Sequence, residues 1–270
     1  MKSIFKILSL ILIVVMVSCK EETKKEDTTD AETPANEVKD SAPDANTAQQ
    51  QGYALPGLKH GLSQSPINID TQSLAGESQH KITMNFKDEV NKVENLGHTV
   101  QLDFKEGSTI SADGENFDFI QCHFHTPSEH LVDGMTYPME MHIVNVMPND
   151  DKDAQTEYLV VSTLFKEGKE NPFIAEFLSK IPKSEKTSED VDAGEIKLGD
   201  LFSAVPEGMQ GDYYYYKGSL TTPPFTESVR WYVSKHVFEA SAAQIAAINE
   251  VEGNNARHVQ ATYGRKVTSD

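Results

Sequence analysis

The chain has 270 residues, a formal net charge of −18 and a hydrophobic fraction of 38%. A protein this acidic repels phosphate backbones and gains no attraction to anionic lipid headgroups. The charge therefore argues against nucleic-acid binding as its function, and no nucleic-acid partner is expected.

The first elements in chain order form an export signal at residues 1–18. Two lysines precede an apolar run at residues 7–17, which is shorter than the roughly 20 apolar residues that a spanning helix needs. Cys19 follows directly, and the segment resembles a bacterial lipobox. That resemblance implies cleavage before Cys19, lipidation of its sulfur and attachment to the cell envelope, on the periplasmic face or the cell surface. The alternative is an ordinary signal peptide that happens to contain a cysteine.

Residues 19–51 are predicted to form a disordered acidic tether. They contain almost no apolar residues and have no periodicity, so they cannot bury enough surface to offset the entropy of ordering. Residues 52–270 are long enough for one large domain. Because a lipidated Cys19 cannot form a disulfide, Cys122 in this domain is expected to be a packed core thiol without a bridge.

Most of the domain is predicted to be strands. Seven segments are rich in β-branched or aromatic residues and often alternate: 80–86, 99–104, 117–125, 139–147, 157–165, 213–220 and 228–234. Two helices are predicted, one after Asn171 with Pro172 at its first position and one that ends at Gly253. This pattern predicts a mainly β fold with a large, twisted, mostly antiparallel central sheet and peripheral helices.

Three histidines are candidates for metal ligands. His123 and His125 lie two residues apart on a predicted strand, so they share a face. His142 lies on the next strand, which can run antiparallel beside the first. Three imidazoles can bind zinc and leave one tetrahedral position open, the arrangement of catalytic rather than structural zinc sites.

The alternative is three histidines on a solvated sheet face. Two acceptors argue against it: Gln121 lies two residues before His123, and Glu140 lies two residues before His142. Each acceptor can take the free ring N–H of its histidine, which fixes the tautomer of a metal ligand. A carboxylate among imidazoles on a buried face would be costly without a metal.

Eight motifs in this domain together resemble the α-class carbonic anhydrases. They occur in the family's order from Gln64 to Gln260: SQSPINI, NLGHT, QCHFHTPSEH, YPMEMH, FKEGKENPF, GSLTTPP, ESVRWYV and NNARHVQ. The resemblance implies the α-carbonic anhydrase fold, a Zn²⁺ cofactor and the reversible hydration of CO2 to bicarbonate and a proton. CO2 and bicarbonate would be the partners, together with the bilayer through Cys19; the oligomeric state is not predicted.

The resemblance also implies a mechanism. Zinc in carbonic anhydrases lowers the pKa of its bound water to about 7, a value established for that family, and the resulting hydroxide attacks CO2. Thr221 would orient the hydroxide by accepting its hydrogen and would pass its own proton toward Glu129. Thr221 and Thr222 would contact the substrate. Read alone, these threonines favour ordinary turn chemistry before two prolines; the rest of the resemblance favours the functional role.

An apolar pocket and a proton path complete the site that the resemblance implies. An apolar wall suits small, uncharged CO2, and the resemblance assigns it to Val144, Val160, Leu220, Val229 and Trp231, each of which would otherwise be sheet core. His98 occupies the position of the family's proton shuttle. The alternative for His98 is an exposed loop residue. Gln101 resembles a residue that orders water on that path, whereas Leu96 stands where a second polar residue is common.

Two other functions compete with CO2 hydration. One is a carbonic-anhydrase-like binding module without catalysis, which would normally lack a zinc ligand. The other is a generic zinc hydrolase that acts on esters, against which the apolar wall argues. His130 is expected in the buried polar scaffold around Glu129. Phe225 stands where many bacterial relatives have a cysteine, in agreement with the absence of a disulfide.

Overall fold

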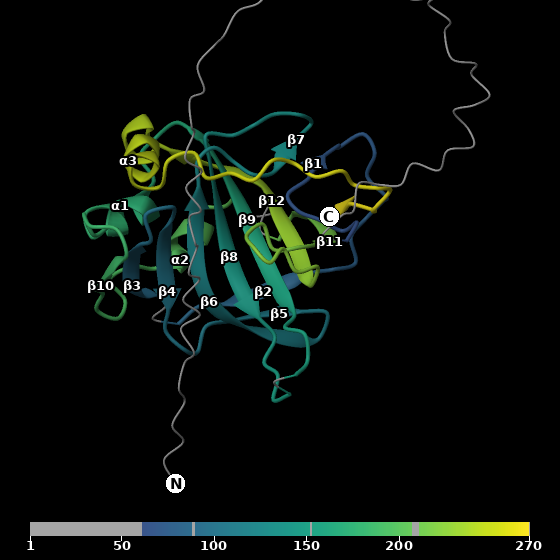
Figure 1. Ribbon diagram of the computed structural model, residues 1–270, viewed down its shortest axis with the longest axis horizontal. Coiled ribbons are helices and arrows are strands. Elements are labelled where there is room, and N and C mark those ends of the chain that lie inside the picture. Colours follow the sequence, from purple (N-terminus) through teal and green to yellow (C-terminus); the bar gives the residue numbers. More distant parts are fainter. Residues whose placement is uncertain (1–60, 88–89, 152, 207–210, 270) are drawn as a thin grey trace, which may run out of the picture. The chain divides into compact units, whose positions relative to one another are not determined.

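The computed structural model describes residues 61–87, 90–151, 153–206 and 211–269 (Figure 1). The predicted signal at 1–18, Cys19 and the tether at 19–51 lie outside these residues. Within the described part of the chain, no helix combines the length and the apolarity needed to cross a membrane.

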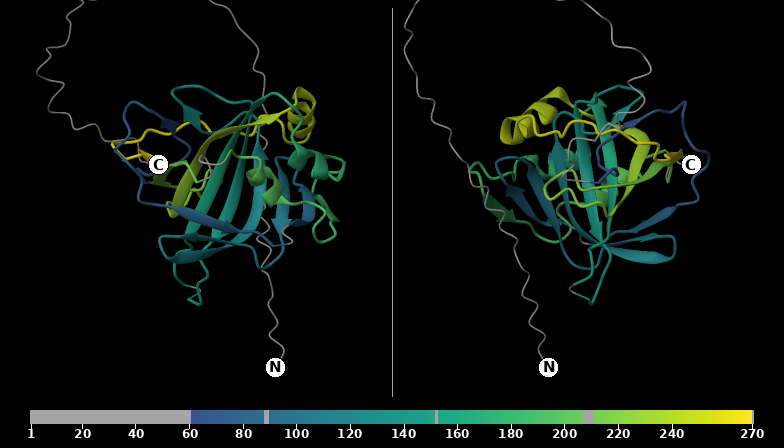
Figure 2. Two further views of the ribbon diagram at one scale, coloured as in Figure 1. Left: turned by 180° about the vertical axis from the view of Figure 1, so that it is seen from behind. Right: turned by 45° about the vertical axis from the view of Figure 1, so that its right-hand side comes forward.

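One large mixed sheet dominates the described residues. Its main path runs β10 (Thr187–Asp190), β3 (Val90–Asn95), β4 (Val100–Phe104), β6 (Glu115–His125), β8 (Met139–Val146), β9 (Tyr158–Glu167), β12 (Val229–Ala240), β11 (Tyr213–Gly218) and β13 (Thr268–Ser269). Along this path every neighbouring pair is antiparallel except β9 and β12, which are parallel. The expected mainly β fold with a large, mostly antiparallel sheet is therefore confirmed (Figures 1 and 2).

Four shorter strands lie off that path. β2 (Ile82–Asn85) pairs with β5 (Thr109–Ala112), and β5 continues the ladder onto β6. β1 (Asn68–Ile69) and β7 (Leu131–Val132) form a separate parallel pair. The first of these pairs continues the sheet beside the N-terminal part of β6. The second joins the start of the described domain to the segment that follows β6.

Among the described residues, three helices accompany the sheet. α1 (Pro172–Leu178) begins where Asn171 accepts the backbone N–H of Ile174, as its sequence predicts. α3 (Ala242–Glu252) begins with a capping box between Ser241 and Gln244 and ends at Gly253. α2 (Leu198–Ser203) was not predicted, because this short helix has no side-chain cap and too few residues for a visible period.

The sheet separates two apolar clusters. Because side chains alternate across a strand, Cys122 on β6 and Ile143 on β8 point into the larger cluster, where they pair with Leu102 and Val161. The opposite face carries a smaller cluster around Val160 and the histidines of β6 and β8. The expectation that Cys122 packs in the core, away from the histidines, is confirmed.

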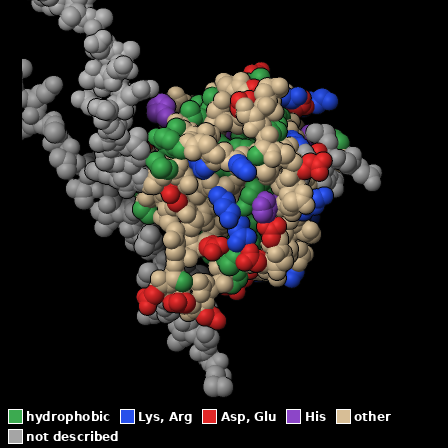
Figure 3. Space-filling view, turned by 90° about the vertical axis from the view of Figure 1, so that its right-hand side faces the viewer, with side chains coloured by type: hydrophobic (Ala, Val, Ile, Leu, Met, Phe, Trp, Pro, Cys, Tyr) green, Lys and Arg blue, Asp and Glu red, His purple; other side chains and the backbone are tan. Residues whose placement is uncertain are grey.

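Charge on the surface is mixed in spite of the acidic composition. Figure 3 shows the face that carries the C-terminal strand, where Lys and Arg side chains gather near the middle with Asp and Glu around them. The net charge of −18 therefore does not give this face a single sign.

Candidate metal centre

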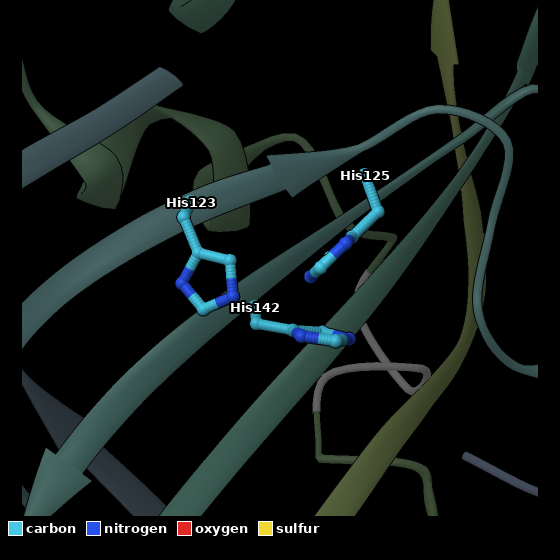
Figure 4. A group of neighbouring side chains, drawn as sticks. All are labelled: His123, His125 and His142. Atoms are coloured by element: carbon cyan, nitrogen blue, oxygen red, sulfur yellow. The ribbon is translucent and has the colours of Figure 1, made fainter. Parts of the chain in front are cut away.

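Three histidines converge on one face of the sheet. β6 carries His123 and His125, β8 carries His142, and the strand register pairs His123 directly with His142. The ring centroids lie 5.0 Å (His123–His125), 5.3 Å (His123–His142) and 4.6 Å (His125–His142) apart. Figure 4 shows the three rings directed toward a common space. One nitrogen from each ring lies within 4.8 Å of the others.

Hydrogen bonds from outside the trio fix two of the rings. The Nδ1 of His123 is hydrogen-bonded to Gln121 Oε1 at 2.9 Å, so its Nε2 is available to a metal ion. The Nε2 of His142 is hydrogen-bonded to Glu140 Oε1 at 2.7 Å, so its Nδ1 is available to a metal ion. Gln121 and Glu140 therefore lie where the sequence places them, as acceptors for the far nitrogen of a metal-binding imidazole.

His125 gives the clearest sign that an ion belongs here. Both of its ring nitrogens are buried and make no short hydrogen bond, although Asn255 lies close enough to raise its pKa and Glu129 Oε1 lies 3.6 Å from its Nδ1. A buried polar atom without a partner is costly, so such an atom calls for a ligand. A divalent ion held by three imidazoles would satisfy His125 and leave a tetrahedral position open. The residues present therefore fit a metal ion.

Burial keeps these imidazoles neutral. It lowers the pKa of His125 to about 4, and it also lowers the pKa values of His123 and His142. For His123 the neighbouring histidines act in the same direction. A neutral ring presents a lone pair, which is the form that a metal binds.

Glu140 organises a buried hydrogen-bond chain behind His142. Its Oε2 accepts the backbone N–H groups of Glu129 and His130, and its Oε1 also lies 2.6 Å from His130 Nδ1. His130 Nε2 in turn lies 2.6 Å from the hydroxyl of Tyr216. Burial alone would raise the pKa of Glu140, but its interactions with His130 and His142 lower it well below the ordinary value.

The position of His130 refines the sequence-based expectation. The ring belongs to the buried scaffold, but its carboxylate partner is Glu140 rather than the adjacent Glu129. Because Glu140 lies on β8 and His130 on the turn after β6, only the folded register brings them together. Tyr216 was missed altogether, since nothing in YYYYKG distinguishes this tyrosine from its neighbours.

A second polar pair lies beside the trio. Glu129 lies beside the buried Thr221, whose side chain helps to lower the pKa of that carboxyl, and the backbone N–H of Arg257 donates to Glu129 Oε1 at 2.8 Å. Burial raises the pKa of Glu129, while its interactions with His142, Arg257 and Thr221 oppose this rise. Thr222 is exposed on the same turn.

The sheet face around the histidines divides into a polar and an apolar half. The row through the ligands consists, from β3 to β12, of Glu94, Gln101, His123, His142, Ser162 and Val233. The next row consists of Lys92, Asp103, Gln121, Val144, Val160 and Trp231. In this second row, side chains change from charged or polar to apolar between β6 and β8.

The five predicted pocket residues all belong to the apolar half. Val144, Val160, Val229 and Trp231 are buried in the smaller cluster, and Leu220 packs against it. The Trp231 ring lies 4.8 Å from that of His142, and its Nε1–H donates to the carbonyl of Ser219 at 3.0 Å. The structure thus brings this set together next to the metal ligands.

His98 and Gln101 lie toward the polar half. His98 is exposed, with its Nδ1 3.1 Å from the carbonyl oxygen of Leu96. Gln101 donates from Nε2 to Glu94 at 3.2 Å and to Asp103 at 2.7 Å. Because carboxylates only accept, these two bonds orient the Gln101 amide, with its oxygen turned away from the acids.

A large sheet that brings three converging imidazoles together between a polar and an apolar wall defines a candidate metalloenzyme. Residues 50–270 match the family model described as eukaryotic-type carbonic anhydrase. The chain belongs to this family of enzymes.

Individual relatives agree with the family match. The chain is 36% identical over 214 residues to a carbonic anhydrase of Neisseria gonorrhoeae, which covers 77% of each protein. It is 36% identical over 207 residues to a carbonic anhydrase of Pectobacterium carotovorum, with 76% and 79% covered. Among solved structures, the α-carbonic anhydrase of Photobacterium profundum is 33% identical with a TM-score of 0.68, over 77% of this chain and 90% of that one.

Proposed function

We propose that the protein catalyses the zinc-dependent, reversible hydration of CO2 to bicarbonate and a proton, with His98 as the proton shuttle. The observation that carries the proposal is the trio His123, His125 and His142, in which every ring keeps a nitrogen free for an ion. Bound zinc would supply a Lewis acid that makes water nucleophilic near neutral pH, a property for which carbonic anhydrases are the standard example.

The protein's own residues would orient and enclose the reactants. Thr221 lies beside Glu129, and with its own proton directed at that carboxylate it would accept a hydrogen from the attacking water. Val144, Val160 and Trp231 offer CO2 an apolar surface beside the ligands. An uncharged substrate gains there by leaving water, whereas the bicarbonate product does not.

His98 would carry the released proton to solvent. Its Nδ1 faces the Leu96 carbonyl, so Nδ1 is the protonated nitrogen of the neutral ring and Nε2 is the acceptor. A histidine at the surface end of the polar half can take a proton through water and pass it to buffer.

Metal analysis and a hydration assay test this function together. Purified domain should contain about one zinc per chain, and stopped-flow CO2 hydration should be lost with a chelator and restored by zinc. Ester hydrolysis without CO2 hydration would favour the zinc hydrolase. The absence of both activities would favour a binding module. Either result would reject the proposal.

We also propose that the protein is exported and anchored to the cell envelope through a lipid on Cys19. The support is the sequence alone: a basic start, an apolar run and a cysteine at the expected cleavage point. Labelling with a radioactive fatty acid should mark the full chain and not Cys19→Ser. Equal labelling of both would contradict the anchor.

A further inference from the structure

The turn that follows Thr221 contains an unusual residue. Phe225 has φ of +61°, a left-handed conformation that side chains other than glycine rarely adopt. Its backbone N–H donates to the Thr222 carbonyl at 2.9 Å, and Leu220 N–H donates to the Thr226 carbonyl at 3.0 Å. The strained residue therefore closes the turn that carries the two threonines.

A stacked arginine faces the ring of Phe225. The guanidinium carbon of Arg257 lies 3.8 Å from the centroid of that ring, a close cation–π contact. Gln64 also donates to the Phe225 carbonyl at 3.1 Å. Glycine would accept this backbone without strain but would offer no aromatic face, so the contact accounts for phenylalanine at this position.

Arg257 also reaches the polar pair beside the histidines. Its backbone N–H donates to Glu129, and its guanidinium donates to the Ser65 carbonyl at 2.6 Å. Ser65 and Ser219 are joined by two further bonds, from Ser65 N–H to Ser219 Oγ at 2.9 Å and from Ser219 N–H to Ser65 Oγ at 3.1 Å. Arg257 thus contacts both the turn that carries Thr221 and Glu129, the carboxylate beside Thr221.

We propose that the stack of Arg257 on Phe225 is a positioning element that fixes the Thr221 hydroxyl relative to the three histidines. Both residues contact the turn or the carboxylate rather than the three histidines, so they would act through Thr221 and Glu129. The inference rests on the proposed function, because it gives this fixed hydroxyl its purpose.

The decisive variant is Phe225→Gly. Glycine removes the strain together with the stack, so the melting temperature should be unchanged or higher while kcat/KM for CO2 hydration falls three- to tenfold. Phe225→Tyr keeps an aromatic face and should stay within twofold of wild type. Tyr263→Gly is the matched control, because Tyr263 is an exposed aromatic residue with φ of +49°, and it should keep full activity.

A second variant shows whether the two residues act as a unit. Arg257→Lys keeps the charge but loses the planar group, and it should reproduce the loss seen for Phe225→Gly. The double variant should lose no more than Arg257→Lys alone, since that variant already lacks the stack and also changes the guanidinium bond to the Ser65 carbonyl. Additive losses, or wild-type kcat/KM in Phe225→Gly, would overturn the proposal.

Amide hydrogen exchange separates this inference from the proposed function. In zinc-free and zinc-loaded protein alike, segment 219–226 should exchange faster in Phe225→Gly than in wild type. If the variant exchanges faster but the wild-type protein does not hydrate CO2, the proposed function is rejected and the positioning role is kept. An active wild-type protein with unchanged exchange in the variant would reject the positioning role alone.

Discussion

The polar and apolar halves of the sheet face around the histidines are built on neighbouring strands with the same geometry. In one row Lys92 and Asp103 form an ion pair at 3.3 Å on β3 and β4, while Val144 and Val160 pair on β8 and β9. Both pairs are antiparallel, although the β3–β4 register shifts between Val90 and Lys92. The difference lies mainly in which side chains occupy the paired positions, and it shows that one sheet can present a polar and an apolar surface on either side of the same three histidines.

The division suits the two species that CO2 hydration must handle. A proton travels along water and titratable groups, so its route needs polar side chains. CO2 is uncharged and competes poorly with water for polar surface, so it needs an apolar one. If the proposed function is right, damage to each half should have a different kinetic signature.

The largest loss of activity is expected from a change in the three histidines, which lie where the polar and apolar halves meet. His125→Ala removes one of three ligands from the trio, so zinc content should fall and kcat/KM should drop by roughly a thousandfold or more. Measurement of bound zinc beside stopped-flow hydration checks this. His236→Ala, on β12 away from the trio, is the control and should keep its metal. Normal zinc content in His125→Ala would contradict the assignment of the ligand.

The second-largest effect is expected when the apolar half is blocked. Val144→Phe fills the space beside His142, and kcat/KM should fall roughly 10- to 100-fold because CO2 cannot reach its position. Zinc content should stay normal. Val146→Phe, two residues further along β8 and on the same face, is the matched control and should lose little. Equal losses in both variants would mean that the effect is general damage to β8.

A smaller and distinct effect is expected in the polar half. His98→Ala should lower kcat roughly 10- to 100-fold by slowing proton transfer, while kcat/KM stays near the wild-type value. Added imidazole should restore the rate, and His258→Ala, another exposed histidine, should change neither parameter. A parallel fall of kcat and kcat/KM would remove His98 from the proton path.

The smallest effect concerns stability behind the polar half. Glu252 accepts hydrogen bonds from Thr126 Oγ1 at 3.0 Å and from Val100 N–H at 3.3 Å, and burial raises its pKa to about 8. An unfolded glutamate titrates near 4.3, so between about pH 4.3 and 8 the folded state holds a proton that the unfolded state has released. The free energy of unfolding therefore falls as pH rises through this window.

Glu252→Gln tests that slope because glutamine does not titrate. Between pH 6 and 8 the variant should lose roughly 1–2 kcal/mol less of its free energy of unfolding than wild type does. Urea denaturation at both pH values measures the difference. Glu250→Gln, an exposed change on the same helix, should follow wild type. Parallel pH profiles for wild type and Glu252→Gln would show that Glu252 does not titrate in this range.

Local periodicity was enough to predict the strands that carry the trio. The alternation in QCHFH and MEMH places His123 and His125 on one face, and His142 with Glu140 on another strand, with no knowledge of the fold. β3 and β10 were missed because VNKVEN is largely polar and all four residues of β10 are exposed. An edge strand without an apolar face leaves no periodic signal.

The remaining interactions depend on segments that are far apart in the chain. His130 finds Glu140 through the register of β6 and β8, and Arg257 meets Phe225 through the packing of two loops. The family resemblance suggested roles for Thr221 and Glu129 but gave none to Arg257 or Glu252. Sequence patterns report the period of an element, whereas these contacts depend on its neighbours.

The direct pairing of His123 with His142 has a consequence for the order of folding. No ion can be held by all three rings until β6 and β8 have joined across the chain segment between them, and a shift of one residue would send His142 to the opposite face. Capture of the ion would thus report that the correct hairpin has closed, and a chain with incorrectly paired strands would be unable to hold the ion.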